Sequence, residues 1–196
     1  MNKNFLVLLA VLVLAAYLFS GIFLKTTLPE VPAYAPKAEE FVKSRAKKEI
    51  VAPPPLRAKK EAPTAEIILT ADGVLAWTNK EREKAGLPVL LPNAELSASA
   101  LVKVRDMFDE QYFAHESPGG EGAGDLANRA GYEFILIGEN LALGNFEGDK
   151  ALVDAWMGSP GHRANILGAR YKEIGIAVGR GIFESRETWL AVQHFA

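Results

Sequence analysis

The sequence of 196 residues contains no cysteine. Disulfide bonds, thiolate metal ligands and a thiol nucleophile are therefore excluded. A domain without disulfides depends on its own hydrophobic core, and residues 66–196, about 130 residues, are enough for a single domain of ordinary size. The net charge is only −2, so the composition gives no indication of nucleic-acid binding.

Charged residues are absent from residues 4–24, and residues 5–24 are almost entirely apolar. A helix of twenty residues is about 30 Å long, which matches the hydrocarbon core of a bilayer. A cleaved signal peptide is the alternative, but its apolar region is usually about 7–15 residues long and is followed closely by a cleavage site. We therefore expect residues 1–24 to be a retained signal anchor in the cell membrane. This single transmembrane helix would leave the C-terminal domain outside the cytoplasm.

Glycine is absent between Gly21 and Gly73, and seven of the eleven prolines lie within residues 25–65. Lysine, glutamate and alanine make up much of the remainder of this segment. Such a composition buries too little apolar area to offset the entropy of ordering the chain. We expect residues 25–65 to be a disordered or partly extended spacer, stiffened by proline and charge.

Local signals predict a mixture of helices and strands in residues 66–196. The predicted elements are a helix from an N-cap at Thr70 or Asp72 to Gly86, a long amphipathic helix from the cap Asn93 to Gln111, shorter helices over 125–131, 149–157 and 162–167, and strands over 174–178 and 189–195. Gly179, Arg180 and Gly181 are predicted to break the first strand.

Histidine is scarce, and two of the three histidines lie in short segments punctuated by glycine and proline. The segments of interest are residues 112–115 (Tyr-Phe-Ala-His), 138–140 (Gly-Glu-Asn) and 156–163 (Trp-Met-Gly-Ser-Pro-Gly-His-Arg). Imidazole and carboxylate groups are the usual means of holding Zn²⁺ or moving a proton, so His115, Glu139 and His162 are the candidate site residues. No HExxH motif occurs, and each histidine could instead be a hydrogen-bonded structural residue.

The remaining polar residues of these segments have simpler interpretations. Asn140 and Asn165 are expected to brace loops and helix ends, and Ser159 precedes a proline in a turn, where serine is common for backbone reasons. His194 alternates with apolar residues on the last predicted strand, so a packed or surface role is expected. The alternative for His194 is a third metal ligand.

The three segments, in this order and spacing, resemble the CAP superfamily (cysteine-rich secretory, antigen 5, pathogenesis-related; also called SCP) in its bacterial, cysteine-free form. The resemblance covers roughly residues 70–196 and implies an α+β fold, a three-layer α-β-α sandwich with a surface cleft. Many members line this cleft with two histidines and two acidic residues, and some bind zinc. His115 and His162 match the histidines and Glu139 matches the first acid. The second acid should follow Trp156 closely but is missing.

The apolar N-terminal run and the resemblance together imply a membrane-anchored exported domain that binds a lipid, glycan or peptide of the cell envelope at His115, Glu139 and His162. Zn²⁺ is the cofactor that His115 and His162 would hold. One alternative is a metal-assisted hydrolase of envelope peptide or glycan, in which Glu139 activates a zinc-bound water. Another is a non-catalytic protein-interaction module. The family has no common reaction, so the sequence leaves open whether the protein is an enzyme.

Overall fold

The protein is described from a computed structural model, in which residues 48–58 and 68–196 are placed. The predicted membrane helix over residues 1–24 lies outside these residues, as does most of the predicted spacer. Within the described ranges, no helix has the length and apolar character needed to cross a bilayer.

The described residues form a mixed α/β fold. In chain order the elements are β1 (Glu49–Val51), β2 (Leu56–Arg57), α3 (Ala71–Lys84), β3 (Leu91–Pro92), α4 (Ala94–Asp109), α5 (Ala123–Arg129), β4 (Leu136–Leu143), α6 (Asp149–Met157), α7 (Pro160–Ile166), β5 (Glu173–Phe183) and β6 (Arg186–Phe195). Thr70 caps α3 and Asn93 caps α4 through their side chains, which confirms both predicted helix starts. The predicted helix over 149–157 is observed with the same bounds.

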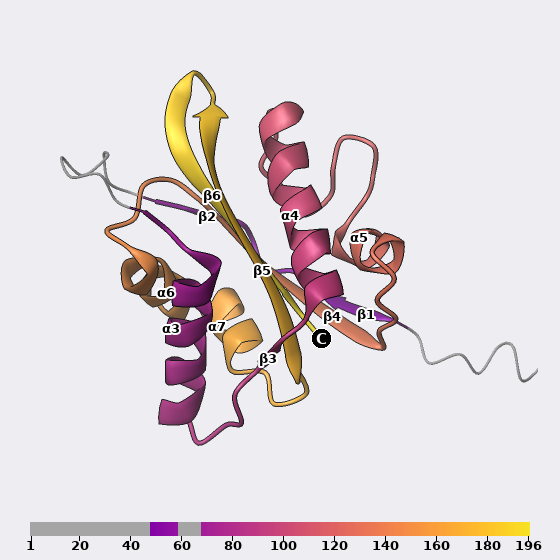
Figure 1. Ribbon diagram of the computed structural model, residues 1–196, viewed down its shortest axis with the longest axis vertical. Helices are drawn as coiled ribbons and strands as arrows, with labels where there is room; N and C mark the ends of the chain where they lie inside the picture. The colour runs from indigo at the N-terminus through magenta and orange to yellow at the C-terminus, as the bar shows by residue number, and fades with distance from the viewer. Residues whose placement is uncertain (1–47, 59–67) are drawn as a thin grey trace, which may run out of the picture. The chain divides into compact units, whose positions relative to one another are not determined.

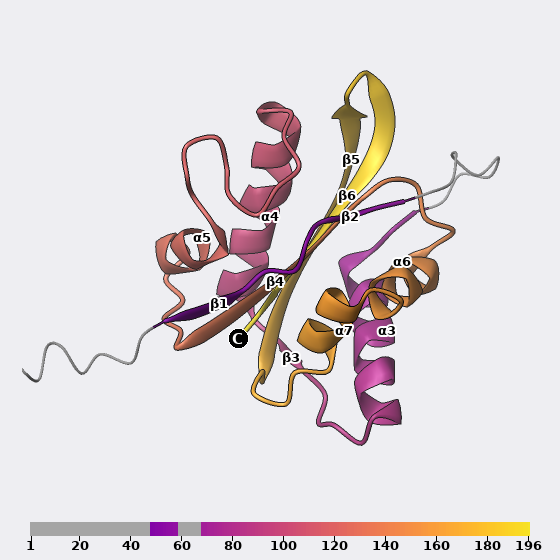
Figure 2. The same cartoon turned by 180° about the vertical axis from the view of Figure 1, so that it is seen from behind.

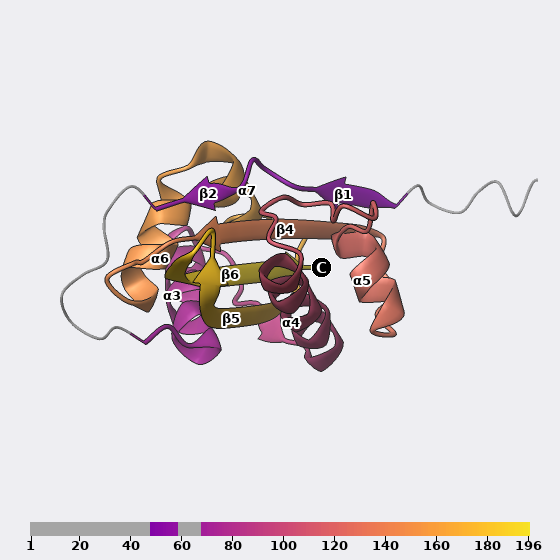
Figure 3. The same ribbon diagram turned by 90° about the horizontal axis from the view of Figure 1, so that it is seen from above.

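One sheet organises the domain, with strands in the order β1-β4-β6-β5-β3 and β2 also paired with β4 (Figure 3). β4 and β5 are both antiparallel to β6, whereas β1 and β2 run parallel to β4. Helix α4 lies on one side of the sheet and α3, α6 and α7 lie on the other (Figure 1). Because successive side chains of a strand point to opposite faces, β4 and β6 contribute to two separate hydrophobic clusters.

The predicted break of β5 at residues 179–181 is wrong, because β5 pairs with β6 without interruption as far as Phe183. The hairpin turns at Glu184 and Ser185, which have φ values of 49° and 65°. The glycines serve packing: a Cβ at Gly179 would lie 2.7 Å from Cγ1 of Val104 on α4. Here glycine allows a helix to approach the strand closely and does not end the strand.

Residues 48–58 lie within the predicted spacer, and they add β1 and β2 to the edge of the sheet beside β4 (Figure 2). Val51 pairs with Gly138 and Leu56 with Ala142, so five steps along this segment match four steps along β4. The extra residue forms a bulge at residues 52–55. Three of these four residues are prolines, which have no N–H to donate to a strand ladder.

Candidate functional site

The centre of the site is Glu139 in the middle of β4, where the side chain is fully buried. Glu139 pairs with His194 across the β4–β6 ladder, so both side chains point to the face that α4 covers. Oε2 of Glu139 lies 2.8 Å from Nε2 of His194. Nδ1 of His194 lies 2.7 Å from Oγ of Ser99 on α4. Strand pairing thus places the Glu139 carboxylate next to the His194 imidazole, and helix α4 covers both groups.

His115 lies in the turn that follows α4, and its Nδ1 is 2.5 Å from Oε1 of Glu139. The two oxygens of Glu139 therefore each meet an imidazole. The other nitrogen of His115, Nε2, contacts the backbone carbonyl of Pro53 in the bulge. Carboxylate and carbonyl oxygens are both acceptors, so His115 carries a proton on both nitrogens when it donates both hydrogen bonds.

Glu139 is ionised at neutral pH. Burial alone would raise the pKa of Glu139, but the hydrogen bonds from His115 and His194 and the positive charges of His194 and Lys103 lower it to about 2. A fixed carboxylate of this kind orients the His115 ring so that Nε2 faces away from Glu139.

Lys103 of α4 is fully buried and holds the turn that carries His115. Its Nζ donates to the carbonyl of His115 at 2.7 Å and to the hydroxyl of Tyr112 at 3.1 Å, while that hydroxyl donates to Asp106. Burial lowers the pKa of Lys103, and the negative charges of Glu139, Asp106 and Glu116 act in the opposite direction. The lysine thus positions His115 without using a side-chain atom of the histidine.

His162 comes from α7, and its Nδ1 lies 2.8 Å from Oγ of Ser159, the residue just before that helix. Its Nε2 is buried and has no hydrogen-bond partner among the described residues. Burial, together with the positive charge of His115, lowers the pKa of His162 to about 4, so the ring is neutral at pH 7. Ser159, in the region where the resemblance predicts a second acid, orients this ring.

Asn140 and Asn165 connect β4 to α7, as the brace interpretation expected. Nδ2 of Asn165 donates to the carbonyl of Glu139 at 3.2 Å and to Oδ1 of Asn140 at 3.1 Å. Nδ2 of Asn140 in turn donates to the carbonyl of His162 at 3.2 Å. The neighbouring Trp156 is fully buried in the core. These amides fix the backbone positions of Glu139 and His162 relative to each other.

Pro53 contacts both histidine segments. The carbonyl oxygen of Pro53 contacts Nε2 of His115. The Pro53 ring fills the space that a Cβ at Gly161, the residue before His162, would occupy. Within residues 48–58, Pro53 is the residue that is buried. The sequence-predicted residues His115 and Glu139 are thus in direct contact, and His162 reaches the same place through its neighbour Gly161.

The described residues include no group of three or more His, Cys, Asp or Glu side chains placed to hold a metal ion. The free Nε2 of His162 is a suitable ligand atom, and Nε2 of His115 becomes one if the Pro53 carbonyl leaves. Both oxygens of Glu139 already meet imidazoles. Zinc sites in proteins usually have three or four protein ligands, so this donor set would need additional ligands.

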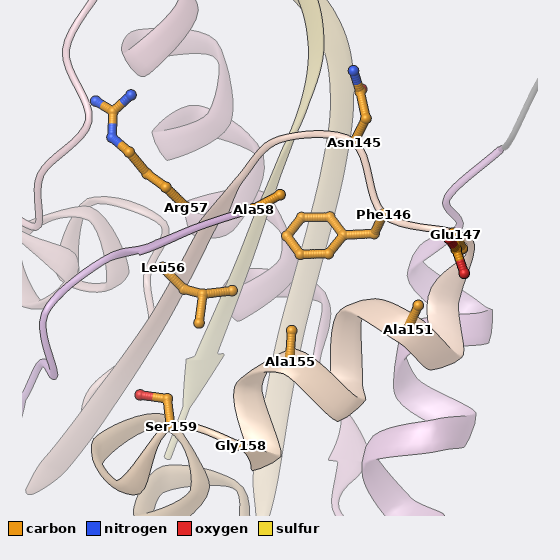
Figure 4. Close-up of a pocket in the computed structure, with 10 residues that line it drawn as sticks. All are labelled: Leu56, Arg57, Ala58, Asn145, Phe146, Glu147, Ala151, Ala155, Gly158 and Ser159. Carbon is orange, nitrogen blue, oxygen red and sulfur yellow. The ribbon is translucent and has the colours of Figure 1, made fainter. Parts of the chain in front are cut away.

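An apolar pocket of about 550 Å³ lies next to the site, between the β2 segment and α6 (Figure 4). Leu56, Phe146 and Ala155 provide much of its apolar lining, and it extends to Ser159, the partner of His162. The pocket could accept an apolar group of a ligand that reaches His162.

The sequence did not identify Ser99 and Lys103 as parts of the site, and it offered His194 as a site residue only through the alternative of a third metal ligand. Ser99 and Lys103 could have been noticed, because they are polar residues within the buried stripe of α4 beside Leu96, Ala100 and Val104. His194 was expected to be packed, and it is. Its contact with Glu139 requires the register of β4 against β6, which a single sequence does not give.

Solved structures with a similar fold include an extracellular protein containing an SCP domain from Bacillus anthracis str. Ames. The match has 29% identity and a TM-score of 0.54, and covers 64% of this chain and 39% of that one. An outer surface protein from Borrelia burgdorferi matches at 20% identity and a TM-score of 0.54, covering 62% of this chain and 88% of that one. The second likeness shows the fold alone.

Two proteins of Bacillus subtilis (strain 168) are similar in sequence. The uncharacterized protein YkwD is 40% identical over 116 residues, which is 59% of this chain and 43% of YkwD. The uncharacterized membrane protein YlbC is 32% identical over 107 residues, which is 55% of this chain and 31% of YlbC. The matched region is therefore less than half of either relative.

The family described as the cysteine-rich secretory protein family (CAP) matches residues 75–195, which span the sheet from β3 to β6 and include His115, Glu139 and His162. That match extends over more than half of the sequence and agrees with the motif resemblance and with the SCP-containing structure from Bacillus anthracis. The chain belongs to the CAP family.

Proposed function

We propose that this CAP domain binds a cell-envelope ligand at His115, Glu139 and His162, and that residues 1–24 anchor it in the membrane. The names of the relatives support an envelope location, since one is a membrane protein and another is an extracellular protein. The resemblance names lipid, glycan and peptide as the ligand classes to consider.

One observation carries the proposal: the buried carboxylate of Glu139 holds His115 so that its outer nitrogen meets a carbonyl oxygen. The Glu139 carboxylate fixes the orientation of the His115 ring, so that the outer ring nitrogen is held against a carbonyl group in a partly buried place. The site is thus suited to recognising a carbonyl group, and the neutral His162 keeps a buried Nε2 that has no partner among the described residues. Amide and acyl groups of envelope molecules supply such partners.

Nuclear magnetic resonance of the imidazoles tests the proposal, because the chain has only three histidines. The full chain, labelled with ¹⁵N-histidine and held in nanodiscs, is titrated with three probes: an N-acetylglucosamine oligomer, a phosphatidylglycerol dispersion and an N-acetylated Val-Ala-Pro-Pro amide. We expect at least one probe to shift the His115 and His162 signals in the wild type. The same probe should leave them unchanged in Glu139→Gln, where one of the two imidazoles loses its acceptor. If no probe shifts either signal, the proposed site is overturned.

A metal-assisted hydrolase is the second candidate, and the unpartnered Nε2 of His162 favours it. Glu139 could activate water only after releasing one imidazole, because both of its oxygens are engaged. Zinc titration of the same labelled chain separates the two functions. Stoichiometric zinc binding that shifts both His115 and His162, and hydrolysis of an envelope peptide or glycan that requires it, would support the enzyme.

A further inference from the structure

The segment over residues 48–58 lies against the candidate site as a ligand would. It runs parallel to β4, pairing through β1 on one side of Glu139 and through β2 on the other. The bulge at residues 52–55 lies opposite the stretch of β4 that contains Glu139. The part of the segment that leaves the strand ladder is thus the part that meets the site.

The contacts in the bulge are specific. The Pro53 carbonyl meets Nε2 of His115, and the Val51 carbonyl accepts from Nδ2 of Asn165 at 3.3 Å. The Pro53 ring lies in a space that exists only because residue 161 is glycine. Backbone carbonyls and one proline ring therefore provide the recognition, and these are features that any extended proline-containing peptide can offer.

The side-chain ion pairs at the two ends of the segment contribute less. Glu49 pairs with Arg170 at 2.7 Å and Arg57 with Glu184 at 3.6 Å, with all four side chains exposed. Exposed ion pairs of this kind contribute between zero and about 1 kcal/mol each. β1 and β2 are short, with three and two residues. The segment is also held by packing, because Leu56 and Ala58 contact the hydrophobic core and Ala58 fills the space beside Gly144. Its removal would leave the edge of β4 with unpaired backbone groups ready to accept another strand.

We infer that the edge of β4, with His115 and Gly161, is a binding groove for an extended proline-containing peptide, and that residues 49–57 are its occupant from the same chain. The inference rests on the proposed function and gives the ligand class at that site. The peptide adds a parallel strand to β4, places a proline against Gly161 and presents the carbonyl of that proline to His115. Addition of a strand to a sheet edge is an established mode of peptide recognition.

An occupant in the same chain competes strongly with an external peptide. A tethered segment has an effective concentration on the order of millimolar, so an external peptide binds well only after the segment has been displaced. Residues 49–57 therefore keep the groove closed until a better peptide, or a force on the chain, removes them.

The test uses the full chain in nanodiscs and a fluorescent peptide with the sequence of residues 48–58, Lys-Glu-Ile-Val-Ala-Pro-Pro-Pro-Leu-Arg-Ala. Pro53→Asp puts a carboxylate into the buried space against Gly161 that the proline ring fills and should release the segment, whereas Pro54→Asp alters an exposed neighbour and is the matched control. We expect the peptide to bind Pro53→Asp at least tenfold more tightly than the wild type or Pro54→Asp. Equal affinity for all three proteins, or no binding to any of them, would overturn the inference.

Hydrogen exchange checks that the segment has been released and that the domain is folded. The amides of Glu49 and Ala58 donate to carbonyls at the two ends of β4, at 2.9 and 2.8 Å. Both should exchange faster in Pro53→Asp, while the amides of β6 stay protected. Unchanged exchange at Glu49 and Ala58 together with unchanged peptide affinity would also contradict the inference.

Gly161→Ala provides an independent variant. Alanine is favourable in a helix, so α7 should form, but the new Cβ would occupy the place of the proline ring. We expect faster exchange at Glu49 and Ala58 but no peptide binding, the opposite binding result from Pro53→Asp. If the peptide fails to bind Pro53→Asp while the glycan or lipid probe still shifts His115, the inference is wrong and the proposed site stands. If no probe shifts His115 in either the wild type or Pro53→Asp, both are wrong.

Discussion

The two faces of the β4–β6 pair carry polar side chains side by side but use them differently. On the face covered by α4, Glu139 meets His194 and the pair carries charge. On the opposite face, Asn140 meets Gln193 at 3.1 Å, and Gln193 donates to Thr78 of α3 at 2.8 Å. All of these residues are fully buried. Two neighbouring residues of β4, Glu139 and Asn140, therefore belong to two different networks, one ionised and one neutral.

The difference lies in the group with which each network ends. The neutral network ends on backbone carbonyls, including that of Val51 in the peripheral segment, so its role is to hold β4, α3, α7 and that segment together. The charged network ends at Nε2 of His115, which meets a carbonyl on a peripheral segment. Binding chemistry is therefore expected on the charged face, with the neutral face as its support.

The largest effect is expected from removing the centre of the charged network. Glu139→Ala leaves His194 buried without its carboxylate partner and removes the largest of the three negative charges that act on Lys103. Loss of one partner from a buried charged network usually costs about 3–5 kcal/mol of unfolding free energy. Urea denaturation of the nanodisc-held chain measures this loss.

Asp106→Ala is a suitable control for that variant, because it removes a carboxylate that contacts Tyr112 outside the Glu139 pair. We expect its cost to be clearly smaller. Equal costs for the two variants would mean that Glu139 is not the centre of the network.

The features of the fold and of the site that the sequence revealed depend on residues close together in the chain. Thr70 and Asn93 cap their own helices within three residues, so composition and spacing were sufficient to find them. The motif segments identified His115, Glu139 and His162 as polar residues of suitable chemistry in short Gly- and Pro-containing segments, although Glu139 proves to lie within strand β4. Asn140 and Asn165 were expected to be braces, and both make such contacts.

The parts that the sequence did not reveal depend on contacts between distant segments. His194 joins Glu139 through strand register, and Lys103 reaches the His115 carbonyl through the turn after α4. Gly179 was interpreted as a strand break, although its lack of a side chain makes room for Val104. Residues 48–58 have the composition of a spacer, and only the edge of β4 gives them strand partners.

A second prediction places charge on the neutral face. Asn140→Asp replaces a donating amide with a carboxylate that faces two acceptors, the His162 carbonyl and Oε1 of Gln193. The hydrogen-bond partners of Asn140 in the described part of the chain carry no positive charge, so we expect a loss of roughly 3 kcal/mol at pH 7. Protonation of the new carboxyl restores a donor, so the loss should shrink as the pH is lowered.

The matched comparison for Asn140→Asp is Glu139→Gln, which makes the opposite change one residue away. Removing charge from the charged face should weaken the response of His115 to ligands, whereas adding charge to the neutral face should mainly lower stability. Urea denaturation and the imidazole spectra measure the two effects. If both variants change stability and ligand response in the same proportion, the two faces do not have separate roles.

The smallest effect concerns pH. The pKa of His162 is lowered from 6.5 to about 4 in the fold, so the unfolded chain binds a proton more readily than the folded one between these values. The contribution of His162 to stability is therefore complete above pH 6.5 and is lost as the pH falls to 4, by on the order of 2 kcal/mol. The pKa of Glu139 is lowered from 4.5 to about 2, so its contribution is present above pH 4.5 and is lost as the pH falls to 2.

Comparison of the wild type with His162→Gln isolates the first of these two steps. Glutamine does not titrate, so the variant should show a smaller loss of unfolding free energy between pH 6.5 and 4 and the same loss as the wild type below pH 4. Urea denaturation at a series of pH values measures both curves. Parallel curves over the upper range would mean that His162 is protonated in the fold as easily as in the unfolded chain. Its Nε2 would then have to face solvent or a buried acceptor, and the site would lack the neutral His162 that the proposed function uses.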